Sequence, residues 1–311
     1  MLKKRFSFIV ALFVLIAFIA AGCGSQQPKV ENKPASAPSA FDNAVVTKEA
    51  TWDAYKKVVA DNQGKTFPLD AAKARELLAG NESKYLIIDM RAPEDFAKGH
   101  IKGAVNLTGV QLAENLDKLP VDKTLLLYCY TGQNSGLAMV PLKAFGYKAL
   151  SISKGFPSAE KAGFEIDTTA VSFKPSEAKP PADPKVAAAQ AGIKENYASV
   201  AKQAGAKTLI LKGTDVKALV DGAPDKYVYI DLRSAEDYGK AHVKGALSIP
   251  LAQLQEKIAT LPKDKTLVLY CYSGQTAAMA TAPLKAEGFK MVSISTGFPG
   301  VEEGKLPIEK K

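Results

Sequence analysis

Residues 124–135 read TLLLYCYTGQNS, and residues 266–277 read TLVLYCYSGQTA. In both stretches an apolar run leads directly into a cysteine, and a polar segment containing glycine follows. A short apolar run bounded by turn residues is typical of a buried β-strand. The residues after each polar segment are compatible with a helix. The sequence therefore predicts the same strand–loop–helix unit twice, with Cys129 and Cys271 at equivalent positions.

The similarity extends far beyond these two stretches. Residues 65–167 align with residues 207–309 without a gap, and roughly 45 of about 100 positions are identical. In the first copy, apolar runs at 85–90, 124–129 and 149–153 alternate with helical patterns at 70–78 and 111–119. Such alternation indicates an α/β fold. We expect two tandem domains, each a mainly parallel sheet flanked by helices.

Composition suggests where these domains begin and end. We expect a signal peptide at 1–22, a tether at 23–48, the first domain at 49–169, a Pro-rich linker at 170–191 and the second domain at 192–311. Segments rich in Pro, Ala and Ser bury little apolar surface, which favours a tether or a linker over a folded element.

The N-terminus has the features of an export signal. A basic head, Lys3-Lys4-Arg5, precedes an apolar run that is too short for a comfortable membrane span. The sequence Ala20-Ala-Gly-Cys23 resembles the lipobox of bacterial lipoproteins, in which the cysteine is acylated, although leucine is more common at the position of Ala20. The resemblance implies lipidation of Cys23 and an exported lipoprotein anchored to a membrane of the bacterial cell envelope. The alternative is simple cleavage nearby, with Cys23 as a stray thiol.

The formal charge of +9 comes from lysines spread along the chain. Because no dense basic run is interleaved with aromatic residues, we expect no nucleic-acid partner. Two histidines and two widely separated cysteines remain in the mature chain, which provides no ligand cluster. We therefore expect no metal and no other cofactor.

The two cysteine loops are the candidate functional sites. A cysteine at the start of a helix lies near the positive end of the helix dipole and near free N–H groups, which favour the nucleophilic thiolate. A glycine three residues later allows the backbone to curve around the sulfur atom as an anion-binding nest. The alternative is a buried, inert cysteine that serves as a small apolar residue. We assign Cys129 and Cys271 as catalytic nucleophiles. The loop residues assigned to substrate binding are Tyr130, Thr131, Gly132, Gln133, Asn134 and Ser135, with Tyr272, Ser273, Gly274, Gln275, Thr276 and Ala277.

Each copy resembles a rhodanese domain, the sulfurtransferase fold. Residues 89–106 and 231–248 resemble the first signature of the family, and Gly-Phe-Pro at 155–157 and 297–299 resembles its closing signature. The resemblance implies that both cysteines accept sulfane sulfur from a small donor and pass it to a thiol or another nucleophilic acceptor. It also implies that His100 and His242 have structural roles. The pairs Asp89–Arg91 and Asp231–Arg233 favour local buried ion pairs over catalysis.

Two departures from the family pattern bear on the donor. Many rhodaneses carry arginine where this chain has Asn134 and Thr276, so the loops lack a fixed cation for the sulfonate of thiosulfate. A polysulfide or persulfide donor does not need that cation. The closing signature differs between the copies, with Lys154 in the first and Thr296 in the second. We expect Lys154 to supply a positive charge to a donor at Cys129.

The function that these features predict is extracytoplasmic sulfur transfer through cysteine persulfides at Cys129 and Cys271. One alternative is a sulfur-binding or sensing module of the same fold, without catalysis, that offers interaction surfaces. A second alternative is a disulfide between the two cysteines. Such a bond requires the two loops to face each other with Cα atoms within about 7 Å.

Overall fold

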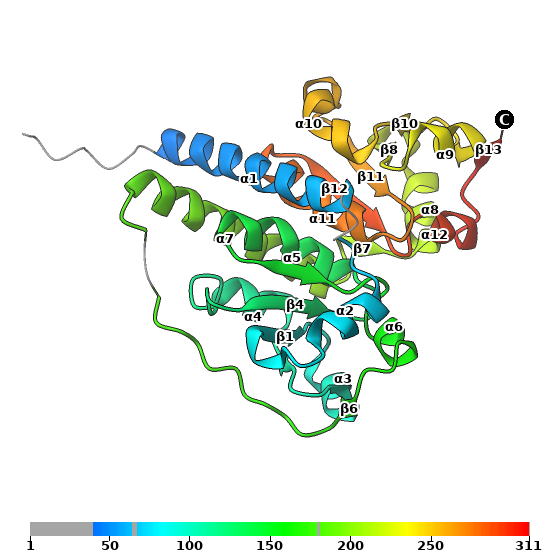
Figure 1. The fold of residues 1–311 in the computed structure, drawn as a ribbon. Coiled ribbons are helices and arrows are strands. Elements are labelled where there is room, and N and C mark those ends of the chain that lie inside the picture. The colour runs from blue at the N-terminus through cyan, green and yellow to red at the C-terminus, as the bar shows by residue number, and fades with distance from the viewer. Residues whose placement is uncertain (1–39, 64–66, 179–180, 311) are drawn as a thin grey trace, which may run out of the picture. The chain divides into compact units, whose positions relative to one another are not determined.

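The computed structural model describes residues 40–63, 67–178 and 181–310, and each repeat is built on a parallel sheet (Figure 1). The first sheet has the order β3-β1-β4-β5, formed by β1 (Tyr85–Asp89), β3 (Val105–Asn106), β4 (Thr124–Tyr128) and β5 (Ala149–Ser151). The second has the order β10-β8-β11-β12-β7, formed by β7 (Ile210–Leu211), β8 (Tyr227–Asp231), β10 (Leu247–Ser248), β11 (Thr266–Tyr270) and β12 (Lys290–Ile294). All pairs within the two sheets are parallel, which confirms the predicted α/β fold.

A small antiparallel ladder accompanies each sheet. β2 (His100–Ile101) pairs with β6 (Ile166–Asp167), and β9 (Ala241–Val243) pairs with β13 (Ile308–Lys310). The helices of the first repeat are α2 (Ala71–Leu78), α3 (Pro93–Lys98), α4 (Gly109–Glu114), α5 (Gln133–Ala144) and α6 (Phe156–Lys161). Those of the second are α8 (Gly213–Gly222), α9 (Ala235–Lys240), α10 (Leu254–Lys257), α11 (Gln275–Ala286) and α12 (Phe298–Glu303). Short 3-10 turns are η1 (Glu82–Lys84), η2 (Pro224–Lys226), η3 (Leu251–Gln253) and η4 (Ile258–Thr260).

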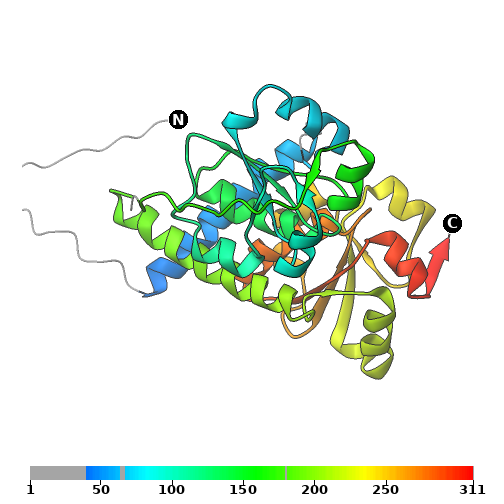
Figure 2. The ribbon, with the colours of Figure 1, turned by 90° about the horizontal axis from the view of Figure 1, so that it is seen from below.

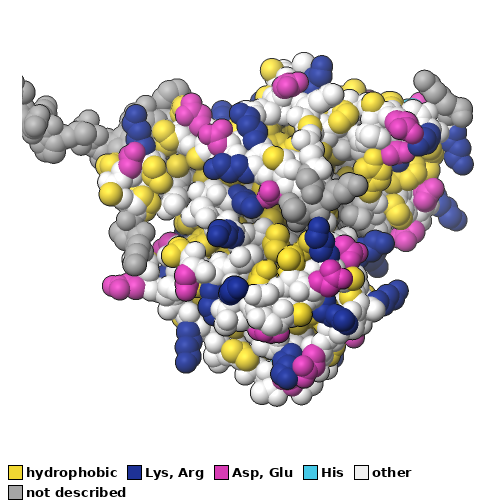
Figure 3. Space-filling model, viewed as in Figure 1, with side chains coloured by type: hydrophobic (Ala, Val, Ile, Leu, Met, Phe, Trp, Pro, Cys, Tyr) yellow, Lys and Arg dark blue, Asp and Glu magenta, His cyan; other side chains and the backbone are white. Residues whose placement is uncertain are grey.

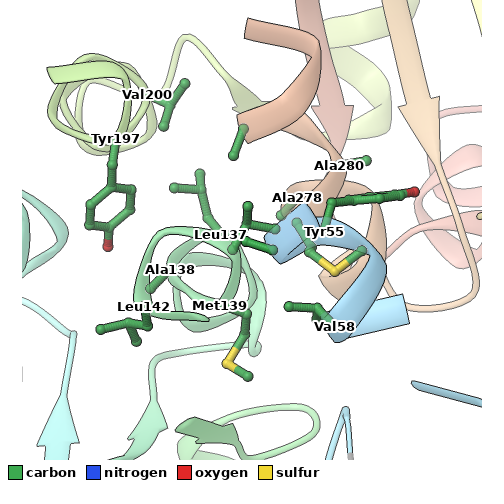
Figure 4. Close-up of a cluster of buried hydrophobic side chains, with 14 of the residues drawn as sticks. Tyr55, Val58, Leu137, Ala138, Met139, Leu142, Tyr197, Val200, Ala278 and Ala280 are labelled. Carbon is green, nitrogen blue, oxygen red and sulfur yellow. The ribbon is translucent and has the colours of Figure 1, made fainter. Parts of the chain in front are cut away.

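The two repeats share one hydrophobic core. It contains side chains from both sheets, such as Leu127 and Leu269, together with side chains from α5 and α11. Figure 4 shows part of it, where Leu137 of α5 lies close to Ala278 of α11. The opposite face of each sheet is covered by shorter helices, which form a separate apolar cluster in each repeat. Burying one face of each sheet in a common core stabilises the repeats together, because neither can expose that face to water without a large free-energy cost.

Two long helices, α1 (Ala40–Gln63) and α7 (Pro184–Gly205), precede the two repeats and pack side by side (Figures 1 and 2). Both helices contact both repeats. α7 packs on α4 and α5 of the first repeat and on α11 of the second, and Lys194 forms an ion pair with Asp117 of the first repeat. α1 packs on α5 and α11 and also contacts the second repeat at η3, where the Tyr55 hydroxyl donates to the Leu251 carbonyl. α7 therefore lies mainly on the first repeat, whereas α1 lies against both.

These helices place the element boundaries differently from the sequence prediction. α1 begins at Ala40, inside the predicted tether, and Thr47 within that segment is buried. α7 begins at Pro184, inside the predicted linker, because Asp183 caps its first turn and Pro184 occupies a position that suits proline. The predicted domain limits at 48/49 and 191/192 therefore fall within helices. The expected signal peptide and Cys23 lie outside the described residues.

One helix of the first repeat is also shorter than predicted. The pattern at 111–119 indicated a helix, but α4 ends at Glu114, where the Asn115 side chain donates to the carbonyl of Gln111. Leu116 and Leu119 are buried from turns instead of from a helix. Within the described part of the chain, no helix combines the length and the apolar character needed to span a bilayer.

Candidate functional site

Both cysteines follow the last residue of a central strand and precede a twelve-residue helix. Cys129 follows β4 and precedes α5, and its Sγ accepts the N–H of Gly132 at 3.2 Å. Cys271 follows β11 and precedes α11, and its Sγ accepts the N–H of Gly274 at 3.1 Å and that of Ala277 at 3.4 Å. Both are free thiols and are almost fully buried. Backbone donors at a helix N-terminus stabilise negative charge on sulfur.

Each loop glycine lies against a side chain of the opposite repeat, where a larger residue would not fit. Gly132 and Gly274 have φ values of 89° and 83°, in the left-handed region that favours glycine. A Cβ at Gly132 would lie 2.6 Å from Oε1 of Gln275, and a Cβ at Gly274 would lie 2.3 Å from Nε2 of Gln133. Each cysteine loop therefore packs against the glutamine of the other loop. The Gln133 amide donates to the Ile294 carbonyl at 3.4 Å, across the same interface.

A chain of side-chain hydrogen bonds reaches Cys129 from the second repeat. The Gln275 amide donates to Ser151 Oγ at 2.8 Å, and Ser151 Oγ donates to Ser135 Oγ at 2.8 Å. The Ser135 hydroxyl lies 3.8 Å from Cys129 Sγ. All of these side chains are buried. A buried network of this kind fixes the rotamers of its members and orients the hydroxyl beside the sulfur atom.

The second repeat lacks the equivalent chain. Ala277 stands where the first repeat has Ser135, so the hydroxyl beside the sulfur atom is missing. Ser293, the counterpart of Ser151, is buried, and its hydroxyl has no hydrogen-bond partner among the described residues. The two cysteine sites therefore have similar backbones but different polar surroundings.

A cavity of about 700 Å³ opens beside Cys129. Its first-repeat wall includes Gly109, Asn134 and Leu137. The opposite wall comes from the second repeat and includes Tyr197 and Ala201 of α7, together with Lys207, Lys212 and Asp215. Cys129 therefore lies in a site that both repeats complete.

The other predicted loop residues have varied roles. The hydroxyls of Tyr130 and Tyr272 donate to Asp95 at 2.6 Å and to Asp237 at 2.7 Å, respectively. Hydrogen bonds from Tyr272, Lys240 and Ser234 together lower the pKa of Asp237 to about 2. Both tyrosines thus tie their loop to equivalent helices, α3 in the first repeat and α9 in the second. The Thr131 hydroxyl donates to Gln133. Asn134 lines the cavity, whereas Ser273 and Thr276 do not.

Lys154, which we expected to supply a positive charge to a donor at Cys129, lies at the surface. Its side chain is exposed and does not line the cavity beside Cys129. Lys154 and Thr296 have φ values of 58° and 61°, so the two closing turns have the same unusual backbone. The residue after each is a glycine whose Cβ would lie within 2.4 Å of the cysteine carbonyl oxygen. The closing turn therefore supports the cysteine loop through its backbone.

The histidines occupy structural positions. His100 stacks on Phe96 with ring centroids 3.7 Å apart, and its two ring nitrogens contact the carbonyls of Phe96 and Thr169. His242 stacks on Tyr238 in the same way, and its Nε2 lies 3.3 Å from a Glu309 carboxylate oxygen. Both contact residues of their own antiparallel ladder or of the helix before it, and neither lines the cavity beside Cys129.

Each Asp-x-Arg pair is buried at the end of a central strand. Arg91 Nη2 lies 2.7 Å from Asp89 Oδ2 and donates to the Gly99 carbonyl at 2.6 Å. Its guanidinium carbon lies 3.7 Å from the ring centroid of Phe156 in the closing signature. Arg233 and Asp231 repeat this arrangement, again at 2.7 Å. The pairs tie the strand end to two other segments, which is the structural role expected from the sequence.

The surface charge is mixed. On the face shown in Figure 3, lysine and arginine side chains are interspersed with aspartate and glutamate. Within residues 40–63, 67–178 and 181–310, no three His, Cys, Asp or Glu side chains are grouped as metal ligands.

Most residues that line the cavity were not anticipated from the sequence, including Gly109, Tyr197, Lys207 and Lys212. Tyr197, Lys207 and Lys212 precede or begin the second repeat, and they reach the first because α7 packs on α4 and α5. The alignment of the two copies could have drawn attention to Gly109, because the aligned residue of the second copy, Leu251, has a much larger side chain.

Comparison with known proteins agrees with this architecture. The family model of the rhodanese-like domain matches residues 70–162 and 213–303, which together make up more than half of the chain. The chain is 35% identical over 80 residues to the thiosulfate sulfurtransferase PspE of Escherichia coli, a match that covers 25% of this chain and 77% of that protein. It is 36% identical over 75 residues to a tRNA sulfurtransferase of Pyrobaculum aerophilum, covering 24% of this chain and 16% of that protein.

Other relatives are also longer than the matched segment, and the chain spans about a third of a Bacillus subtilis relative. Among solved structures, a thiosulfate sulfurtransferase of Pseudomonas aeruginosa is similar over 81% of this chain and 46% of its own length, with 19% identity and a TM-score of 0.37. The matches to the family model coincide with the two parallel sheets and include both cysteine loops. The chain therefore belongs to the rhodanese-like domain family, of which it carries two copies.

Proposed function

We propose that the protein is a sulfurtransferase that carries sulfane sulfur as persulfides on Cys129 and Cys271. The observation that carries this proposal is the pair of backbone N–H groups, from Gly132 and Gly274, that each donate to a cysteine Sγ at the start of a helix. These donors stabilise the attacking thiolate and, after transfer, hold the negative terminal sulfur. Membership in the rhodanese-like family supports the same chemistry.

The donor that fits best is a polysulfide or a persulfide, and the acceptor is a thiol. The loop position that many rhodaneses fill with arginine is occupied by Asn134 at the first site and by Thr276 at the second. Neither side chain carries the charge needed to hold a sulfonate. Transfer from a persulfide breaks one S–S bond and forms another, so a thiolate nucleophile and a stabilised thiolate leaving group suffice.

Mass spectrometry of the intact protein tests this function. After incubation with inorganic polysulfide, wild-type protein should gain the mass of one sulfur atom at each of two sites. Cys129→Ser and Cys271→Ser should each gain one, and the double variant none. Subsequent addition of a thiol should remove the added sulfur. Wild-type protein that stays unmodified, or sulfur transfer that survives in the double variant, would refute the proposal. An oxidised pair of cysteines would instead favour the disulfide hypothesis.

We further propose that the protein works outside the cytoplasm as a membrane-anchored lipoprotein. Support comes from the basic head, the apolar run and the Ala-Gly-Cys sequence ending at Cys23. Metabolic labelling with a fatty acid should mark the wild-type protein and leave Cys23→Ala unmarked. The variant should appear in the soluble exported fraction or as an unprocessed precursor. Equal membrane retention of a fully processed Cys23→Ala protein would contradict the anchor.

A further inference from the structure

The cavity beside Cys129 contains an unused hydrogen-bond donor. Tyr197 projects from α7 along α5, on the side that carries Ala138 and Leu142 (Figure 4). Its side chain is buried and lines the cavity, and its hydroxyl has no hydrogen-bond partner within the described part of the chain. Burial raises the pKa of the Tyr197 phenol, so the hydroxyl remains a donor at neutral pH. A buried polar group without a partner is costly, and a ligand that accepts its proton would remove that cost.

The counterpart of Tyr197 in the first repeat is satisfied. The Tyr55 hydroxyl donates to the Leu251 carbonyl at 2.7 Å. Leu251 is itself buried, so its side chain fills space next to α1. In the first repeat the equivalent residue is Gly109, and a Cβ placed there would lie 3.9 Å from the Tyr197 hydroxyl oxygen and 3.3 Å from the Ala201 Cβ. A glycine at 109 therefore lets α4 approach α7 closely, so that α4 presents only backbone beside the Tyr197 hydroxyl.

The wall of the cavity combines polar residues of the Cys129 loop, apolar side chains of both repeats, and charged side chains of the second repeat. Leu137 and Ile210 contribute apolar surface, and Lys207 and Lys212 contribute two cations. Asp215 also lines the cavity, so the lysines outnumber the carboxylates there. Neither lysine forms a salt bridge with a described residue. A site of this size suits a small organic molecule and is far larger than an inorganic sulfur anion requires.

We infer that the cavity binds an organic hydropersulfide with an apolar body and a terminal carboxylate, as the sulfur donor of Cys129. The inference rests on the sulfur-transfer function proposed above. The carboxylate pairs with Lys207 and Lys212, the apolar body lies between Gly109 and Leu137, and the Tyr197 hydroxyl donates to the inner sulfur atom of the donor.

The transfer step balances without a further reactant. The Cys129 thiolate attacks the terminal sulfur of R–S–SH and forms a new S–S bond to it. The S–S bond of the donor breaks, and its electron pair leaves with the organic group as R–S⁻. The terminal sulfur keeps its proton until it ionises within the loop. The Tyr197 hydroxyl stabilises the charge that develops on the leaving sulfur atom.

The test uses a Cys271→Ser protein, in which only Cys129 accepts sulfur. Three donors are compared, namely the hydropersulfide of mercaptohexanoate, that of the neutral mercaptohexanol, and inorganic polysulfide. The selectivity is the ratio of kcat/KM for an organic donor to that for polysulfide. Tyr197→Phe should lower the selectivity for both organic donors by about two- to tenfold, the value of one hydrogen bond. Gly109→Leu, which installs the residue of the second repeat, should lower it further, because the added side chain presses on Ala201 and displaces α7, which carries Tyr197, from the cavity wall.

The roles of Lys207 and Lys212 are tested separately, by comparing the KM values of the carboxylate and alcohol donors. Lys207→Ala and Lys212→Ala should raise KM for the carboxylate donor and not for the alcohol donor. As a matched control, Tyr197→Phe in a Cys129→Ser protein should leave the selectivity of Cys271 unchanged. Unchanged selectivity at Cys129 in both Tyr197→Phe and Gly109→Leu would overturn the inference, provided that polysulfide still loads Cys129. Failure of polysulfide to load Cys129 in the parent protein would instead refute the sulfur-transfer function itself.

Discussion

The two cysteine loops have nearly the same backbone but different neighbours. Cys129 and Cys271 each accept the N–H of a glycine three residues later. Only Cys129 is close to a serine hydroxyl that is tied to the opposite repeat, and only Cys129 lines the cavity under Tyr197. Three substitutions account for the difference, placing Ala277, Leu251 and Thr276 in the second repeat where the first has Ser135, Gly109 and Asn134. Two copies of one cysteine loop can thus acquire different surroundings while the cysteine itself is kept.

The largest effect on stability should come from a feature that the repeats share. Asp89→Ala and Asp231→Ala each leave a buried arginine without its carboxylate, and should lower the free energy of unfolding by about 3–5 kcal/mol. Because the two pairs have the same 2.7 Å geometry, the losses should be similar. Denaturant unfolding of both variants measures this. If only one of the two variants had a lower free energy of unfolding, the two ion pairs would not contribute equally to stability.

A second pair of variants compares the equivalent buried serines of the two repeats, Ser151 and Ser293. Ser151→Ala removes the nearer acceptor of the Gln275 amide, which retains only the Ile152 carbonyl at 3.5 Å, and should cost about 1–3 kcal/mol, the penalty of an unsatisfied buried N–H. Ser293→Ala removes a buried hydroxyl that has no partner among the described residues, so it should be neutral or stabilising. Thermal and denaturant unfolding of the two variants provide the comparison. Equal destabilisation would mean that the network around Ser151 contributes nothing specific.

Exchanging Ser135 and Ala277, the residues beside the two sulfur atoms, tests whether the serine hydroxyl affects the rate of persulfide formation. Ser135→Ala should slow persulfide formation at Cys129 by about two- to tenfold, because a hydrogen bond contributes about 0.5–1.5 kcal/mol. Ala277→Ser should increase the rate at Cys271 by less, since Ser293 has no donor corresponding to Gln275 behind it. Single-turnover kinetics in proteins that retain one cysteine isolate each site. Identical rates before and after the exchange would remove Ser135 from the mechanism.

The smallest effect should come from the closing turn. Lys154→Thr and Thr296→Lys exchange the one charged residue that distinguishes the two turns. Because Lys154 is exposed and outside the cavity, we expect changes in thiosulfate or polysulfide turnover within about twofold, as for an exposed charge. Turnover at two salt concentrations provides the measurement. A larger, salt-sensitive loss in Lys154→Thr would restore the role that the sequence suggested for this lysine.

Much of the fold was predictable because its signals are local. Apolar runs that end in a cysteine, and an ungapped repeat, indicate parallel strands and two copies of one α/β unit. The ion pairs of Asp89 and Asp231 were also predictable, since each carboxylate lies two residues from its arginine. The packing of α1 and α7 against both repeats was not, because it depends on contacts between residues more than a hundred positions apart, such as Tyr55 and Leu251. The Ala-rich start of α7 has the composition of a linker, and only its cap at Asp183 marks it as a helix.

Helices α1 and α7 make the two halves of the chain depend on each other. α7 precedes the second repeat but packs mainly on the first, and α1 precedes the first repeat but also packs on α11 and η3 of the second. The segment between β6 and α7 keeps the two halves together in one polypeptide. A pair of identical chains would carry the same residue at equivalent positions. In this single chain the equivalent positions differ, with glycine at 109 and leucine at 251.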